Sequence, residues 1–213
     1  VIDLIEIGAG GGSLATLDGR GTIGVGPDSA GANPGPACYA LGGNQPTLTD
    51  ANLTLGYLDP EYFLGGKMKL DANRAVNAIG AAIATPLNIP QERAAWGIHE
   101  KINEDVARAF RTHASERGFD CRRATMIASG GSGPAHACRV ARKLMVPTVI
   151  FPIGAGVMSA VGLLASPLSF EIVRSDRIAI DELNPSKFES RFKPLVEASA
   201  EPLLDAGLTA REL

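Results

Sequence analysis

Short apolar runs bounded by glycine, proline and aspartate recur along the chain, and their lengths are typical of β-strands. Two such runs, residues 13–17 and 21–26, are joined through Asp18-Gly19, a dipeptide that suits the positive φ angles of a hairpin turn. We therefore expect a hairpin at this position. Further strands are predicted at residues 2–7, 124–128, 148–151 and 169–180.

Apolar residues at helical spacing separate the later strands. The longest helix is predicted over residues 90–117, where Ile98, Ile102 and Val106 share one face and Gly118 ends the helix. Asp71 is suited to cap the N-terminus of the helix predicted over residues 72–85, which comes before the long helix. The other predicted helices span residues 72–85, 134–145 and 156–165, and a last one begins near residue 185.

This order of elements predicts an α/β fold, with a mixed sheet flanked by helices and a long loop insertion at about residues 27–71. The insertion is rich in proline and glycine, and its least loop-like part is residues 47–53. A connection of this length inside a compact domain is usually functional.

Composition narrows the function classes. The chain has 213 residues and a formal net charge of −3, and it carries no basic field of the kind that binds nucleic acid. No apolar stretch approaches the roughly 18 residues that span a bilayer, and no signal peptide opens the chain. We therefore expect a cytoplasmic protein with no membrane contact. The three cysteines lack zinc-ligand spacing and are expected to be reduced thiols: Cys38, Cys121 and Cys138.

A glycine-rich loop between the first two predicted strands is the strongest chemical signal. Gly10, Gly11, Gly12 and Ser13 can bring main-chain N–H groups together around an anion, because no Cβ atoms hold the ligand away. Neither a Walker lysine nor the helix of a dinucleotide fingerprint follows. The loop therefore predicts a nucleotide phosphate grip at the tip of a hairpin, the alternative being a flexible turn.

A second glycine cluster stands between a predicted strand and a predicted helix. It contains Gly130, Gly131, Ser132 and Gly133, and Pro134 suits the first turn of the helix that follows. A glycine turn below a helix N-terminus favours a negative or polar ligand group. A third glycine turn lies at residues 152–156, and either turn alone is also compatible with a tight connection.

Three single residues are candidates for chemistry. Glu6 directly precedes the glycine loop, where it is either a functional carboxylate or a solvent-facing strand-end charge. Asp50, near Asn52, offers oxygen acceptors to a metal, water or substrate, or else organises the long loop as an Asx-type turn. His136 can hydrogen-bond a ribose or base or transfer a proton, and a packed structural histidine is the alternative. His99 and His113 are interpreted as surface or packing residues.

The order of the motifs resembles one lobe of the actin-like ATPases, the clan of sugar kinases, Hsp70 and actin. The loop at residues 6–13 is similar to the second-lobe phosphate loop of that clan, and residues 129–134 are similar to its adenosine turn. The resemblance implies that Gly10 to Ser13 face phosphates and that Gly130 to Gly133 lie under the adenosine. It also implies that Glu6 acts on Mg²⁺ through water or on the attacking water.

Successive blocks resemble a more specific family. Residues 8–15, 25–39, 47–53, 63–66 and 130–137 look like the motifs of the hydantoinase A, N-methylhydantoinase and 5-oxoprolinase family, over about residues 1–175. Members couple ATP hydrolysis to opening a cyclic amide, and acetone and acetophenone carboxylases contain a similar subunit. The resemblance therefore implies ATP and Mg²⁺ as cofactors, a cyclic amide or ketone as substrate, and a hydantoinase B-type partner. The alternative function, from a class other than enzymes, is a non-catalytic lobe for assembly or regulation.

The same resemblance suggests how the chain is organised. Residues 1–180 are expected to form the second nucleotide-binding lobe, and residues 181–213 a truncated C-terminal helical segment. The family's amino-terminal lobe has no counterpart in these residues, and the chain opens within a strand-like run without methionine. We therefore expect the chain to be a piece of a larger enzyme whose own N-terminal lobe completes the site.

Overall fold

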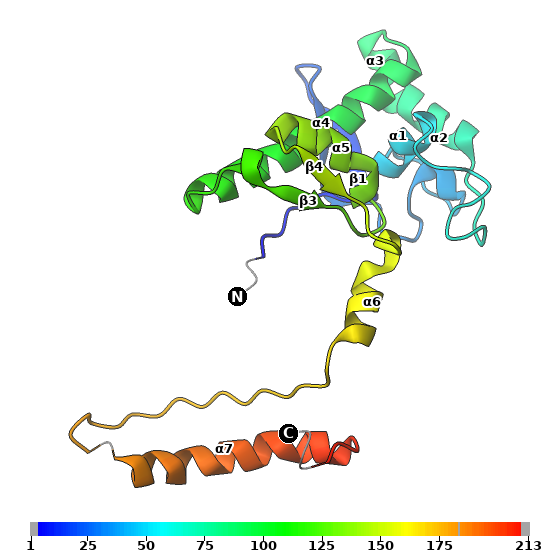
Figure 1. Cartoon of the computed structure of the whole chain (residues 1–213). Helices are drawn as coiled ribbons and strands as arrows, with labels where there is room; N and C mark the ends of the chain where they lie inside the picture. Colours follow the sequence, from blue (N-terminus) through cyan, green and yellow to red (C-terminus); the bar gives the residue numbers. More distant parts are fainter. Residues whose placement is uncertain (1–3, 183, 210–213) are drawn as a thin grey trace. The chain divides into compact units, whose positions relative to one another are not determined.

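The computed structural model describes residues 4–182 and 184–209, and the chain divides into two compact units, Val1–Ser159 and Ala160–Leu213 (Figure 1). The first unit carries the predicted glycine turns. It mixes helices with two small sheets, which confirms the α/β class.

An antiparallel hairpin begins the first unit. Strands β1 (Ser13–Leu17) and β2 (Ile23–Ser29) pair with Ala15 opposite Val25, both of which are buried. The predicted Asp18-Gly19 turn is replaced by a wider connection, in which the Asp18 carboxylate accepts hydrogen bonds from the N–H groups of Arg20 and Thr22. The positive φ angle falls at Gly21 and not at Gly19, because these bonds close a five-residue loop.

The predicted insertion contributes to the core. It contains a 3₁₀ turn, η1 (Ala37–Tyr39), and helix α1 (Leu48–Thr54), whose first six residues are buried. The interpretation of residues 47–53 as the least loop-like part is confirmed. Helix α2 (Ala72–Ile79) follows, and the Asp71 carboxylate accepts from the N–H of Arg74 as the predicted cap.

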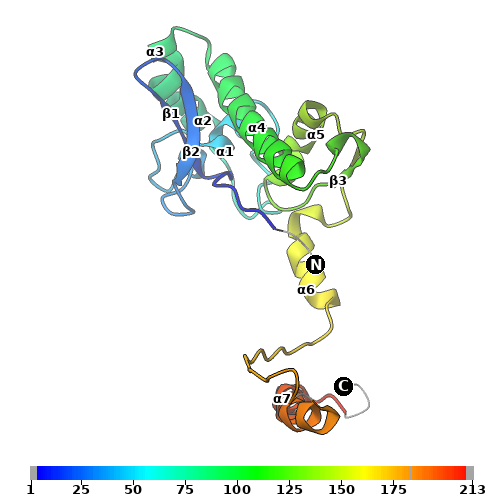
Figure 2. The same ribbon diagram turned by 90° about the vertical axis from the view of Figure 1, so that its left-hand side faces the viewer.

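Helix α2 continues through a π-helical stretch, η2 (Gly80–Ala84), into the short helix α3 (Thr85–Leu87). The long helix α4 (Gln91–Glu116) has almost the predicted bounds. It contacts β2, α1 and η2, and Figure 2 shows it lying along the hairpin. The main core joins these elements and includes Ala15, Val25, Leu48, Ile79, Ile83, Ile98 and Ile102.

The second glycine cluster lies beside a separate parallel sheet. A 3₁₀ turn, η3 (Cys121–Arg123), leads into β3 (Thr125–Ile127), which pairs in parallel with β4 (Thr148–Ile150). The crossover between the two strands is helix α5 (Gly133–Leu144), which packs on α4 through Ala107, Val140 and Leu144. A third 3₁₀ turn, η4 (Ala155–Val157), follows β4.

Two predicted strands are wrong in the described residues. Residues 4–7 of the predicted strand 2–7 have no regular structure, and residues 1–3 lie outside the described residues. Residues 169–180 also form no strand. Both segments are apolar enough for a strand, but neither finds a pairing partner in the described part of the chain. The predicted single mixed sheet is accordingly replaced by one antiparallel and one parallel pair.

Helix α6 (Met158–Ala165) runs across the boundary between the two units in the sequence. The second unit contains α7 (Pro185–Asp205), whose Asn184 cap accepts from the N–H of Lys187. This agrees with the helix predicted from about residue 185. No helix among residues 4–182 and 184–209 combines the length and apolarity needed to cross a bilayer.

Candidate functional site

The first glycine loop is a tight turn at the start of β1. The N–H of Ser13 donates to the carbonyl of Gly10 at 3.0 Å, and the N–H of Gly10 donates to the hydroxyl of Ser13, also at 3.0 Å. Two of the four predicted N–H donors are therefore used inside the turn.

The remaining donors of this turn are those of Gly11 and Gly12. The carbonyl of Gly11 accepts from the N–H of Thr49, and the carbonyl of Gly10 accepts from Ser13. In a trans peptide the N–H points opposite to the carbonyl of the same plane. The N–H of Gly12 thus points away from Thr49, and the N–H of Gly11 points out of the turn.

Glycine is required in this loop for close approach. Neither Gly11 nor Gly12 has a positive φ, but a Cβ on Gly11 would lie 2.7 Å from the Thr49 hydroxyl, and one on Gly12 would lie 2.7 Å from the Ser29 hydroxyl. Around Gly10 a Cβ would meet nothing within 4 Å. Gly10 is therefore the position at which space is left open for a ligand.

The second glycine turn ends at the N-terminus of α5. Gly130 has a φ of 88°, and its N–H donates to the carbonyl of Ala155 in the third glycine turn. The N-cap of α5, Ser132, makes no side-chain capping bond, and Pro134 occupies the first turn. Helix α5 thus starts without a side-chain cap, which favours a polar or anionic group at this point.

One cavity of about 250 Å³ brings the two glycine clusters together. Gly10 lines it from the first loop, Ser132 and Gly133 line it from the second turn, and His136 lines it from α5. Its apolar walls come from α1, α4, β3 and α5, and include Leu48, Ile102, Val106, Met126 and Val140. A mostly apolar hollow with a few convergent polar groups is the usual form of a ligand site.

Asp50 lies away from this cavity, fully buried beneath the long loop. Its carboxylate accepts from the N–H groups of Ala37, Cys38 and Thr47 at 3.2, 2.8 and 2.8 Å, and from the Thr47 hydroxyl at 2.8 Å. With Thr47 it forms the capping box of α1. These contacts are those of the loop-organising alternative.

Glu6 lies in the irregular segment before the glycine loop and is exposed to solvent. It does not line the cavity that contains Gly10. In the described residues no group of three or more His, Cys, Asp or Glu side chains is arranged to hold a metal ion. A magnesium ion, which is commonly bound through one or two carboxylates together with substrate phosphates, needs no such cage.

His136 belongs to a buried polar cluster that joins α1, α4 and α5. The Asn52 amide nitrogen lies 3.1 Å from His136 Nε2, and the Asn52 oxygen lies 2.8 Å from His99 Nδ1. On its other side, His136 Nδ1 lies 2.9 Å from the Asn103 oxygen. The two imidazole rings stack at 4.6 Å, and Tyr57 stacks on His99 at 4.7 Å.

Both histidines of this cluster are kept neutral. Burial lowers the pKa of His136 to about 4, and nearby His99 acts in the same direction. Burial also lowers the pKa of His99, and Arg139 adds to this effect while Glu100 opposes it. The His136 ring therefore presents an uncharged surface to the cavity at neutral pH.

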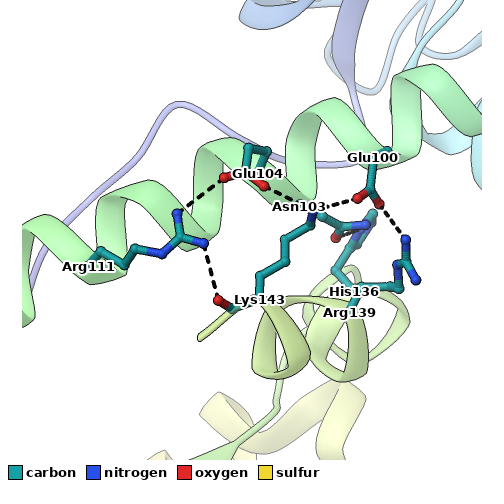
Figure 3. A network of polar contacts seen from close by, with 7 residues as sticks. All are labelled: Glu100, Asn103, Glu104, Arg111, His136, Arg139 and Lys143. Atoms are coloured by element: carbon teal, nitrogen blue, oxygen red, sulfur yellow. Dashed lines mark hydrogen bonds and ion pairs between the residues drawn. The ribbon is translucent and has the colours of Figure 1, made fainter. Parts of the chain in front are cut away.

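A charged network holds α4 and α5 together outside this cluster (Figure 3). Lys143 pairs with Glu100 and Glu104, Arg139 pairs with Glu100, and Arg111 bridges Glu104 and the Lys143 carbonyl. The Arg139 guanidinium also lies 4.8 Å from the centre of the Trp96 ring. These contacts fix α5, and with it the second glycine turn, on α4.

The sequence does not predict the hydrogen bonds that Thr49, His99 and Asn103 make. Of the two interpretations of His99, surface or packing residue, the second is confirmed, because the side chain is fully buried and stacked between other rings. One feature of the sequence indicates that these polar side chains are buried. His99 and Asn103 are one helical turn apart, on a face of the helix that Ile98 and Ile102 also occupy. Cys38 is buried as a small hydrophobic residue, and burial beside Asp50 raises the pKa of its thiol, so it is not a nucleophile.

These observations define an α/β unit in which two glycine turns meet at one cavity. The sequence profile of the hydantoinase/oxoprolinase family matches residues 1–172, so the chain belongs to this family. It is 41% identical to caprolactamase subunit alpha of Pseudomonas jessenii over 182 residues, which are 85% of this chain and 26% of that protein. It is 32% identical to 5-oxoprolinase of Dictyostelium discoideum over all of this chain and 18% of that protein.

Solved structures give the same relationship. A nucleotide-free structure of acetone carboxylase matches with a TM-score of 0.84 and 32% identity, over 96% of this chain and 30% of that one. The ATP-dependent caprolactamase of Pseudomonas jessenii matches with a TM-score of 0.69 and 38% identity, with the same coverage. The chain thus spans between 18% and 30% of the length of these relatives. The two solved structures are described as those of an ATP-dependent carboxylation enzyme and an ATP-dependent caprolactamase.

Proposed function

We propose that this chain is the second nucleotide-binding lobe of an actin-like, ATP-dependent enzyme that opens a cyclic amide. The observation that carries the proposal is the cavity in which Gly10 of the first loop meets Ser132 and Gly133 of the second turn. The two clusters lie far apart in the sequence, and each offers main-chain N–H groups or a helix N-terminus, which are the groups that bind phosphates and polar ligands.

The residues fit the two ends of a nucleotide. In this proposal the outward N–H groups of Gly11 and Gly12 hold the phosphates, with Gly10 and Ser13 shaping the turn. Residues 130–133 support the adenosine, and the neutral ring of His136 forms part of the cavity wall beside them. The exposed Glu6 carboxylate is proposed to act on Mg²⁺ through water, next to the phosphates.

ATP, when bound, would transfer its γ-phosphoryl group to the amide oxygen and leave as ADP. Water would then add to the activated carbon, the ring C–N bond would break with the nitrogen leaving as the amine, and a second water would release the phosphate. The chain's own contribution is to position the nucleotide and neutralise its charge with fixed main-chain dipoles. Since an actin-like site lies between two lobes, we expect the chain to need its own N-terminal lobe and a hydantoinase B-type partner. The 213 residues alone are expected to be catalytically silent.

Carboxylation of a ketone is the second candidate reaction. It is favoured by the TM-score of 0.84 with acetone carboxylase, which exceeds the 0.69 with caprolactamase. The higher sequence identity, 41%, is with caprolactamase subunit alpha. Both reactions use the same ATP site, and the substrate decides between them.

Phosphate release by the full-length protein with its B-type partner tests the proposal. ATP is supplied with 5-oxoproline, hydantoin or caprolactam in one series, and with acetone or acetophenone plus bicarbonate in the other. We expect one series to stimulate phosphate release, and Gly10→Ala to abolish the stimulation. ATP binding without turnover in any series would leave the non-catalytic lobe as the function, and absence of ATP binding would refute the proposal.

A further inference from the structure

The buried side chains of Asn52, His99, Asn103 and His136 form one chain of hydrogen bonds, while His99 Nε2 and Asn103 Nδ2 have no hydrogen-bond partner in the described part of the chain. With the Asn103 oxygen facing His136, Nδ1 of His136 carries the proton and donates to it, and turning both amides would reverse all the bonds of the chain together. A neutral imidazole then accepts at Nε2, and the donor is the Asn52 amide. The Asn52 oxygen in turn accepts from Nδ1 of His99. Each bond thereby fixes the direction of the next.

Both ring nitrogens of His136 are used inside the protein. The imidazole therefore has no remaining donor or acceptor to offer a ligand in the cavity that it lines. This differs from the sequence-based hypothesis in which His136 hydrogen-bonds a ribose or base. Its contribution to the cavity is the placement of the ring and of the helix that carries it.

The cluster connects the two glycine turns. On α1, Thr49 holds the Gly11 carbonyl through its N–H and its hydroxyl, and Asn52 follows almost one helical turn later. On α5, His136 follows Gly133, the first residue of the helix, by a similar step. The contact between Asn52 and His136 therefore sets the distance between the element that holds the first loop and the element that begins at the second turn. Helix α4 supplies the fixed support through His99 and Asn103.

We infer that Asn52, His99, Asn103 and His136 are positioning residues that set the spacing and orientation of the two glycine turns around the nucleotide. The inference rests on the proposed nucleotide site. Buried apolar side chains would fill the same space, but hydrogen bonds with fixed direction define one geometry where apolar contacts permit several. In this inference the four buried polar side chains serve the accuracy of the site more than the stability of the fold.

Nucleotide affinity in the full-length protein tests this inference. Asn52→Leu and Asn103→Leu remove the directed bonds and keep the number and branching of side-chain heavy atoms, and Leu53→Ala is the matched control. Leu53 is a buried residue of α1 that packs with Cys38 and Leu70, outside the cluster. We expect both leucine variants to bind ATP about tenfold more weakly or worse. Leu53→Ala should lower the melting temperature and bind ATP like the wild type.

Side-chain ¹⁵N spectra provide a second readout, which does not depend on ATP affinity. In the wild type, His136 should be a single tautomer, with one protonated and one unprotonated ring nitrogen, and ADP should leave both resonances in place. Asn103→Leu should abolish this preference.

The outcomes separate the two claims. Folded leucine variants with wild-type ATP affinity, an equal loss in Leu53→Ala, or an ADP-induced change at His136 Nε2 would each overturn the positioning role. A wild-type protein that binds no nucleotide would instead overturn the proposed function.

Discussion

Thr49 donates twice to the carbonyl oxygen of Gly11, through its N–H at 2.8 Å and through its hydroxyl at 2.9 Å. The bonds join the long loop to the first glycine turn and orient the peptide plane between Gly11 and Gly12. The N–H of Gly12 then points in the opposite direction, away from Thr49. A residue in the predicted insertion thus determines which main-chain donor of the turn is offered to a ligand.

Thr49→Val should weaken ATP binding several-fold. The variant removes the hydroxyl bond and leaves the main-chain bond, so the peptide plane gains freedom while the fold loses about 1 kcal/mol. Isothermal titration with ATP measures the change. Thr54→Val is the control because its hydroxyl bonds the Asp50 carbonyl on the same helix, away from Gly11. Equal affinity of the two variants would show that Thr49 does not orient the phosphate donors.

Gly10→Ala should abolish ATP binding without changing stability. A Cβ at Gly10 meets no protein atom within 4 Å and enters the space lined by the two glycine turns. Gly11→Ala should instead lower both stability and affinity, because its Cβ would lie 2.7 Å from the Thr49 hydroxyl. Thermal unfolding and ATP titration of the same preparations separate the two variants. A Gly10→Ala protein with wild-type affinity would show that this loop does not grip phosphates.

Asp50→Asn should destabilise the fold by about 2–4 kcal/mol. The carboxylate accepts from three main-chain N–H groups and the Thr47 hydroxyl, and an amide places an NH₂ group against some of these donors. Denaturant unfolding measures the loss. If Asp50 acts in catalysis as the sequence-based hypothesis holds, the variant keeps its stability and loses turnover.

Stability should fall between pH 6.5 and pH 5. The unfolded chain protonates its histidines near pH 6.5, whereas burial and His99 lower the pKa of His136 to about 4. Between these values the unfolded state binds more protons, so stability is lost as pH falls, by up to about 3 kcal/mol once pH passes below 4. Above pH 6.5 the group contributes no pH dependence.

Denaturant unfolding at pH 7, 6 and 5 tests this prediction, with His136→Gln as the comparison. The groups around His136 are the uncharged Asn52, Asn103 and His99, with Glu100 and Arg139 beyond them, and Glu100 stays ionised because Lys143 and Arg139 hold it. A flat profile in the wild type, or an equal decline in the variant, would contradict the neutral buried ring.

Elements with a strong local signal were predictable from the sequence. The bounds of α4 follow from its apolar periodicity, and α2 follows from the Asp71 cap. The strands predicted at residues 2–7 and 169–180 had the right composition, but a strand needs a partner, and pairing is not a local property. For the same reason the single mixed sheet was not formed.

The site was predictable in part. The glycine clusters are recognisable in the sequence, and in the structure Gly10, Ser132 and Gly133 line the same cavity. The contact between Asn52 and His136 was not predictable, because 84 positions separate them and only the packing of α1 and α5 on α4 brings them together. For Asp50 the sequence is misleading. The oxygen acceptors around it in the sequence are typical of a ligand site, but in the structure main-chain N–H groups satisfy the carboxylate.

The proposed function requires one nucleotide to lie between the two glycine turns. A crystal structure of the full-length protein with Mg²⁺ and a non-hydrolysable ATP analogue would show where the nucleotide binds. We predict phosphate oxygens about 3 Å from the N–H groups of Gly11 and Gly12. The adenosine should lie against residues 130–133, with both ring nitrogens of His136 still bonded to Asn52 and Asn103. A nucleotide bound elsewhere in the protein, with the space between Gly10 and Ser132 unused, would contradict the account.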